Sequence, residues 1–512
     1  MVEASRESQN LNTTRLLSGS AYRRGILSGF DLLNRLRSSP YKAQSPEATL
    51  DLDQITSHAA QAVAISVAFG IVAVVIWLVQ LFLLLLYNHN KYHYYYESNE
   101  FLFFLVVALN IAGSGIVAYE LVYLRWSIPR RFLRRYYKPN PSIGGINLLT
   151  RPIFRFLKQQ HIIQPNPSQN VITFAKYPFL GAGKKISEWT IAIDRKPSKN
   201  EAEKSQSSQE RIQIPVNEFY SAADSEVAKL QLSDVQQLSL LFVDGFELNA
   251  DGQILNKTQL SPESNLPEEQ VWSLGEGNLS EERRAYRVYR YSNTERDQRL
   301  SYFLRFYNLG SITFVETSTH ILFGIDRQRF SLTSTLKEGK FSRIVKTVLV
   351  TFLLFLIGAF TTYYLGGYAL VGLLYLVVFV SQLLTWRSED KRTRIEAKFQ
   401  EEYNYGLFQT FRESISDQFY DSYYGIQDLI MYWKSIDQAV LASIIEMLKG
   451  HGVDTSQFQE MATNIINQGV MVSGGNFTAN QVTAGANSTS IMSNNSRAIA
   501  NPVGSSINLE KQ

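Results

Sequence analysis

The chain has 512 residues, no cysteine, and 50 Lys and Arg against 46 Asp and Glu, which gives a formal net charge of +4. The absence of cysteine excludes thiol catalysis, thiolate metal sites and disulfides. The small positive charge does not indicate nucleic-acid binding, because the basic residues gather beside apolar segments, where they can meet anionic lipid head groups.

Four apolar segments dominate the pattern of the chain. They lie at residues 59–87, at residues 101–124, and as a pair within residues 344–386 that is joined by a short turn at Gly366 and Gly367. A helix needs about 20 mostly apolar residues to cross the hydrocarbon of a bilayer. The sequence therefore predicts four transmembrane helices in two hairpins, residues 59–124 and 344–386.

Basic residues flank these hairpins on one side. Lys and Arg are frequent in the flanking residues 15–37, 125–138, 340–346 and 387–394, and rare in the connections within the hairpins. Because such residues stay preferentially on the cytoplasmic side, we expect a multi-pass protein of the plasma (inner) membrane. Both termini and the large domain are then cytoplasmic, with residues 1–58 as a basic N-terminal segment and the lipid bilayer as a partner.

The region between the hairpins, residues 125–343, has the pattern of a cytoplasmic α+β domain. A helix is predicted over Val216–Leu230, after Pro215. Short apolar runs separated by turn residues predict strands and a mostly antiparallel sheet. These runs are residues 171–177, 188–194, 238–248, 285–292, 299–308 and 312–324.

After the second hairpin, residues 387–468 carry apolar residues three or four positions apart, among them Tyr403, Leu407 and Phe411. This spacing predicts cytoplasmic amphipathic helices that pack on the α+β domain or on another subunit. The tail, residues 469–512, is a low-complexity segment rich in Gly, Asn and Ser. We expect it to be disordered or to form short strands by stacking with copies of itself, so that the protein is a homo-oligomer.

One Gly-containing segment is the candidate ligand-binding site. It lacks the Gly and Ser/Thr positions of a phosphate loop, so it predicts a surface turn between two strands. An alternative is a nest of backbone N–H groups that binds an anion with help from the adjacent lysines. The candidate residues are Tyr177, Phe179, Gly181, Gly183, Lys184, Lys185 and Trp189.

Three polar residues interrupt the first hairpin: Gln80, Asn110 and Glu120. Polar groups in hydrocarbon are costly, so they either form helix contacts or line a conduction path. The sequence shows no paired acid and base, no nucleophile beside a base and no metal-ligand set. We therefore expect no catalytic residue, no metal and no cofactor.

Several segments resemble a family of bacterial multi-pass membrane proteins. The resemblance rests on the basic residues 14–36, on the segment 170–194 with its Pro-Phe pair, two glycines and Trp189, and on the hairpin 300–316. It spans about residues 13–323 and implies the same architecture without an activity. We expect a membrane-anchored cytoplasmic sensing or scaffolding protein that binds a small ligand or a protein partner. An oligomeric channel or transporter is the alternative, and an enzyme is a distant third.

Overall fold

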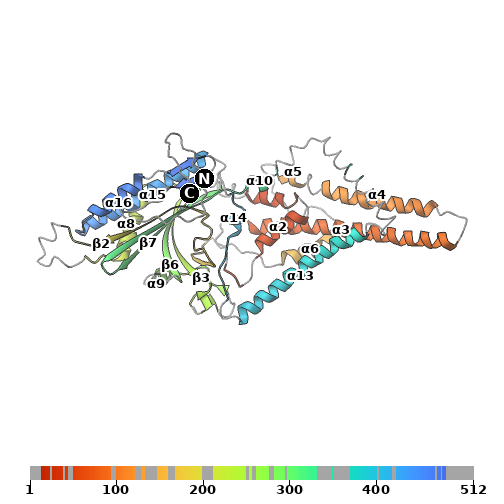
Figure 1. Cartoon of the computed structure of the whole chain (residues 1–512), viewed down its shortest axis with the longest axis horizontal. Coiled ribbons are helices and arrows are strands. Elements are labelled where there is room, and N and C mark those ends of the chain that lie inside the picture. The colour runs from red at the N-terminus through yellow and green to blue at the C-terminus, as the bar shows by residue number, and fades with distance from the viewer. Residues whose placement is uncertain are drawn as a thin grey trace, which may run out of the picture.

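The computed structural model of the protein contains an α+β sheet domain and a helical part (Figure 1). The residues that it describes are 13–23, 26–37, 41–43, 50–93, 100–122, 128–132, 147–159, 168–198, 212–249, 253–256, 261–275, 282–293, 297–330, 332, 349, 352, 369–399, 403–417, 423–467, 470–473 and 476–479.

A six-stranded sheet forms the centre of the sheet domain, in the order β1-β3-β6-β7-β8-β2. The first strand, β1, runs parallel to β3, and every other neighbouring pair is antiparallel. The predicted mostly antiparallel sheet is therefore confirmed. The strands are β1 (Val171–Phe174), β2 (Lys184–Asp194), β3 (Val235–Asp244), β6 (Arg283–Asn293), β7 (Gln298–Leu309) and β8 (Ile312–Leu322).

One face of this sheet, the helix face, is covered by α8 (Val216–Lys229) and α15 (Tyr423–Gly450). Strand side chains alternate between the two faces, so that Leu300, Tyr302 and Leu304 of β7 point into the core beneath these helices. In α15 the apolar residues recur at helical spacing, which gives one buried side. The helices α9 (Glu268–Gly275) and α16 (Ser456–Asn467) extend the same layer.

The prediction of amphipathic helices in residues 387–468 fails at residues 403–410, around Gly406, which are not helical. Here Leu407 forms a parallel bridge with Phe174 at the β1 edge of the sheet. Pairing with an exposed strand edge satisfies backbone groups that a helix would otherwise satisfy internally. We call residues 403–417 the strap; it includes the single-turn helix α14 (Phe411–Ser414).

The helical part has a core of its own. Residues 13–20 form a helix, and α2, α5, α6 and the start of α3 pack around it together with Trp386 of α13 and Phe411 of the strap. Figure 1 shows the sheet domain and the helical part at opposite ends of the long axis, with α14 between them. The helices are α2 (Ile26–Leu36), α3 (Leu52–His93), α4 (Glu100–Val122), α5 (Ile128–Phe132), α6 (Asn147–Lys158) and α13 (Ala369–Phe399).

Among the described residues, one helix segment, Leu52–Gln80, is long and apolar enough to cross a membrane, and Phe104–Gly113 is a shorter apolar stretch. The described residues thus do not by themselves support the prediction of four transmembrane helices. Most of the third predicted span lies outside them, since only residues 349 and 352 are described between residues 333 and 368.

The remaining elements are short. In the tail, β9 and β10 pair with each other as an antiparallel hairpin; residues 480–512 lie outside the described part. The short elements are η2 (Glu247–Asn249), β4 (Leu255–Asn256), β5 (Ser261–Pro262), α10 (Arg327–Phe330), β9 (Val470–Ser473) and β10 (Asn476–Ala479).

Candidate functional site

The segment that joins β1 to β2, residues 175–183, crosses the sheet from one edge to the other, because these two strands are the outermost ones. Five gaps of about 4.8 Å, roughly 24 Å in all, separate the edge strands, a distance that a segment of this length can span. The sequence predicts a turn between two strands, and residues 180–181 do form a turn, but the two strands that the segment joins lie at opposite edges of the sheet. We call this segment the crossing loop and the face that it covers the loop face.

Phe179 attaches the crossing loop to the loop face. Its ring centroid lies 4.5 Å from that of Phe303, 4.8 Å from His320 and 5.4 Å from Tyr286, and its side chain is 8% exposed. Edge-on and tilted aromatic contacts of this kind add to the burial of apolar area. Phe179 is therefore a core residue, whereas Tyr177, two residues before it, is 44% exposed. Burial of the Tyr177 hydroxyl raises its pKa to about 12, with smaller effects of Glu188 and Glu413.

The crossing loop holds a carboxylate of the protein itself, whereas the nest alternative predicts an external anion bound with help from the lysines. The backbone N–H groups of Gly181 and Gly183 both donate to Oε1 of Glu413, over 2.8 and 3.1 Å. Both glycines have positive φ, 79° and 84°, a conformation that brings alternate N–H groups to one side of the loop. The other oxygen of Glu413 accepts from the backbone N–H of Thr410 in a capping box at α14.

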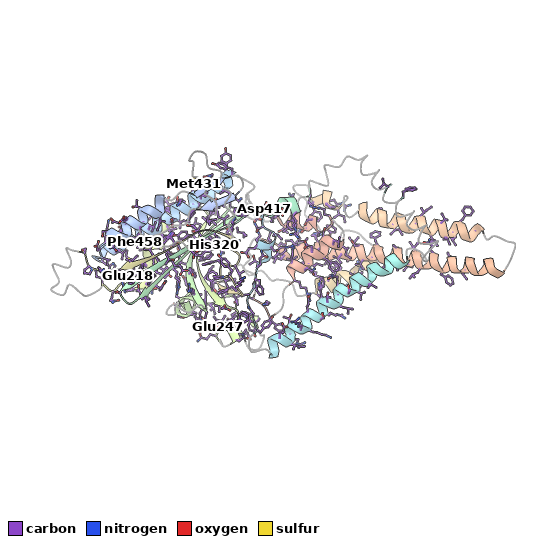
Figure 2. All side chains as sticks on the ribbon, viewed as in Figure 1. Glu218, Glu247, His320, Asp417, Met431 and Phe458 are labelled. Atoms are coloured by element: carbon purple, nitrogen blue, oxygen red, sulfur yellow. The ribbon has the colours of Figure 1, made fainter. Side chains whose placement is uncertain are left out.

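His320 lies at the centre of the sheet domain, beneath the crossing loop (Figure 2). Its imidazole Nε2 lies 2.9 Å from the hydroxyl of Ser318. Burial lowers the pKa of His320 to about 3, so that the ring is neutral at physiological pH.

The two lysines and Trp189 do not join this cluster. Lys184 and Lys185 are exposed at the start of β2, and Lys185 pairs with Glu188. Trp189 points to the helix face, where its Nε1–H donates to Oδ1 of Asp437 over 3.0 Å. The predicted site residues therefore do not form one site, because the crossing loop lies on one face of the sheet and Trp189 points to the other.

Asp437 is a buried carboxylate between the sheet and α15. The hydroxyl of Tyr302 donates to the same oxygen as Trp189, over 2.9 Å, and the side chain of Asp437 is 1% exposed. Burial raises the pKa of Asp437, although the two hydrogen bonds and Lys434 act in the opposite direction. The arrangement joins α15 to two strands through satisfied polar groups.

The strap contacts both parts of the molecule. On the sheet side, Leu407 N–H donates to Thr173 O and its carbonyl accepts from Ala175 N–H. On the helical side, Phe411 and Ile415 belong to the core of the helical part. Figure 2 shows Asp417, the last residue of the strap, at the junction between the two parts.

A buried arginine fixes the same junction. Arg412, 2% exposed, forms an ion pair with Asp297 over 3.0 Å and donates to the carbonyl of Phe323 over 2.8 Å. Thr13 in the helical part also donates to the Asp297 carboxylate. The carboxylate of Asp297, in the sheet domain, is therefore shared by one residue of the helical part and one residue of the strap.

Of the three polar residues predicted to lie inside the membrane, Gln80 on α3 is 2% exposed. The side chains of Asn110 and Glu120, on α4, lie outside the described part, so their roles stay predictions. The described residues contain no group of three His, Cys, Asp or Glu side chains that could hold a metal ion.

Sequence reasoning missed Glu413, Arg412 and Asp437. A signal existed for Glu413, because Thr410 and Glu413 stand at the Thr-x-x-Glu spacing of a capping box. Asp437 lies within an apolar helix, and only its burial against Trp189 and Tyr302 distinguishes it from a solvated acid.

The comparison with protein families finds a match to the AbeC-like domain over residues 188–480. This range begins within β2 and includes the strap, α15 and α16. No curated protein matches the chain, and no solved structure matches it. The match covers more than half of the 512 residues, and the chain therefore belongs to the AbeC-like domain family.

Proposed function

We propose that this chain is a membrane-anchored cytoplasmic sensing or scaffolding protein, in which the strap couples the sheet domain to the membrane helices. The observation that carries the proposal is the double attachment of the strap. It leads from α13 to α15, adds to the edge of the sheet through Leu407, and buries Phe411 in the core of the helical part.

The apolar surface of α3 supports a membrane anchor. Its first half is buried, with Ile55 and Val63 at 0% exposure, whereas Val75, Val79 and Phe82 in its second half are 52%, 46% and 61% exposed. The helix carries no Asp, Glu, Lys or Arg from Gln54 to Asn90. Exposed apolar surface of this extent is unfavourable in water and favourable in hydrocarbon.

Two other helices, α4 and α13, also expose apolar side chains. Phe101, Phe104 and Ile111 of α4 are exposed, as are Val377, Val380 and Leu384 of α13. Together with the apolar residues 344–361, they support two hairpins that span the plasma (inner) membrane. The basic flanks then favour a cytoplasmic location for both termini and the sheet domain.

The strap can transmit a change because it is hydrogen-bonded to both parts of the molecule. On the sheet side, the Glu413 carboxylate holds the crossing loop. On the helical side, Arg35 of α2 donates to the carbonyl of Ser414 over 3.1 Å. A ligand or partner that displaces the crossing loop would therefore act on α2 through two residues that are adjacent in the chain.

The coupling is tested by hydrogen–deuterium exchange of the full-length protein in nanodiscs. Glu413→Ala removes the carboxylate that joins the crossing loop to the strap, so we expect faster exchange both in residues 177–183 and in α2. Glu446→Ala, at an exposed site on α15, is the control and should change neither. Faster exchange in the crossing loop alone would show that the strap does not couple the two parts.

A further inference from the structure

A long segment of one charge sign follows the second predicted span. Between residues 121 and 160 the chain has nine Lys or Arg and no Asp or Glu, and the next acid along the sequence is Glu188 of β2. Such a cluster directly beside the cytoplasmic end of a transmembrane helix is typical of segments that bind anionic lipids. The helix α6 is the longest described element within this segment, and it shows how the basic side chains are arranged.

The helix α6 turns an apolar side inward and a basic side outward. Leu157 is fully buried in the core of the helical part, and Ile153 and Phe154 pack against the same core. Arg151 and Arg155 are exposed. Because they are four positions apart, they lie next to each other on the same side of the helix. The basic side of α6 is therefore a surface, and the apolar side fixes its orientation.

A third arginine, from α13, joins α6 where exposed apolar surface ends. The guanidinium carbon of Arg387 lies 5.7 Å from the ring centroid of Phe156, and Arg387 is exposed. Leu384, one helical turn earlier, is 58% exposed and belongs to the apolar surface that we assign to the membrane. In that assignment, Arg387 and the adjacent side of α6 lie at the level of the lipid head groups.

Two acids next to these helices are engaged elsewhere. Asp53 of α3 forms an ion pair with Lys158 over 3.4 Å, and Glu389 of α13 forms one with Arg37 over 3.0 Å. Within the described part of the chain, the three exposed arginines have no carboxylate partner. Their guanidinium groups carry N–H donors in a planar arrangement that matches phosphate oxygens. The charge of this surface therefore complements an anionic head group.

We propose that Arg151 and Arg155 of α6, together with Arg387 of α13, bind the head groups of anionic phospholipids in the cytoplasmic leaflet. The inference rests on the proposed function, for which it names the lipid class that the protein binds. A zwitterionic head group carries the same phosphate beside a positive group of its own. Three arginines without an acid therefore favour lipids with a net negative charge.

The site lies beside the contact between α13 and α2. Trp386, which precedes Arg387, packs against Phe30 of α2 with 5.3 Å between the ring centroids, and its carbonyl accepts from Arg37 over 2.6 Å. The same helix α2 reaches the strap through Arg35. A head group at Arg387 would thus hold α13 next to one end of the coupling that we propose above.

The test is native mass spectrometry of the detergent-purified full-length protein, titrated with phosphatidylglycerol or with phosphatidylcholine. We expect the wild type to prefer phosphatidylglycerol. R151Q/R155Q should bind this lipid about ten-fold more weakly, with its affinity for phosphatidylcholine unchanged, and R387Q should be weakened several-fold. R151K/R155K keeps the charge and should retain the preference, which separates the loss of charge from a disturbance of α6.

A matched control removes the same charge from the sheet domain. K176Q/K449Q changes two exposed lysines and should bind both lipids as the wild type does. A preference for phosphatidylglycerol that R151Q/R155Q retains, or equal losses in the two double variants, would overturn the site. Carbonate extraction of membranes reports insertion separately. A protein that inserts without this lipid preference contradicts the site alone, whereas a protein that carbonate extracts from the membrane contradicts the proposed function.

Discussion

At the scale of single residues, Glu413 shows how a site for an anion can be occupied from within the chain. Its carboxylate accepts from two loop amides and from its own helix cap at the same time. Hydrogen bonds to a charged acceptor are stronger than neutral ones. The crossing loop therefore depends on a residue more than 200 positions away in the sequence.

Asp437 allows a direct measurement of such a buried contact. Asp437→Ala leaves the N–H of Trp189 and the O–H of Tyr302 buried without an acceptor, so we expect the free energy of unfolding to fall by about 3 kcal/mol. Asp437→Asn retains one acceptor oxygen and should cost about 1 kcal/mol. Urea titration in detergent micelles measures both. Gln438→Ala, at the next position, which is exposed, serves as the control. If Asp437→Ala lowered the free energy of unfolding no more than Gln438→Ala does, Asp437 would not hold these two donors.

His320 predicts a pH dependence of stability. Its folded pKa of about 3 lies below its ordinary value of 6.5, so the unfolded chain binds a proton more readily. The stability contributed by neutral His320 is present above pH 6.5 and is lost as the pH falls from 6.5 toward 3. Between pH 7.5 and 5, the free energy of unfolding of the wild type should decrease by about 2 kcal/mol more than that of His320→Gln. Equal pH dependence in the two proteins would show that His320 is not buried.

At the scale of elements, the strap depends on a close approach of two backbones. A Cβ at Gly406 would lie 2.2 Å from the carbonyl carbon and oxygen of Phe174. Because these are backbone atoms, they cannot move aside without breaking the bridge to the sheet edge.

Gly406→Ala should therefore destabilise the protein by about 3 kcal/mol or more. Gly450→Ala is the matched control, since a Cβ there would meet nothing within 4 Å and Ala is the better helix former. Differential scanning calorimetry in detergent compares the two melting temperatures. Equal values would mean that the strap does not lie against β1.

The elements of the sheet domain were largely predictable, and their order was not. Alternating apolar and polar residues in β2 and β7, and the helical spacing in α8, gave the elements from local sequence. The order of strands depends on contacts between distant residues, and nothing near Val171 or Lys184 indicates that their strands lie at opposite edges. The same reason explains why a helix was wrongly predicted for the start of the strap. Tyr403 and Leu407 have helical spacing, but they pack against a sheet edge.

At the scale of the molecule, two cores with different surroundings meet at a junction to which the strap contributes. The core of the sheet domain is closed by α8 and α15, whereas the helices of the other part continue into exposed apolar surface. A chain of this kind suits a protein that holds a cytoplasmic domain at a membrane and reports its state across the junction.

Cysteine labelling tests the proposed orientation of the chain in a membrane. The chain has no native cysteine, so Lys91→Cys, near the end of α3, and Ser221→Cys, on the exposed side of α8, each introduce one reactive site. Both are treated with a membrane-impermeant maleimide in spheroplasts, before and after lysis. We expect labelling of Lys91→Cys in intact spheroplasts and of Ser221→Cys only after lysis. Labelling of Ser221→Cys from outside, or of neither residue before lysis, would contradict this orientation.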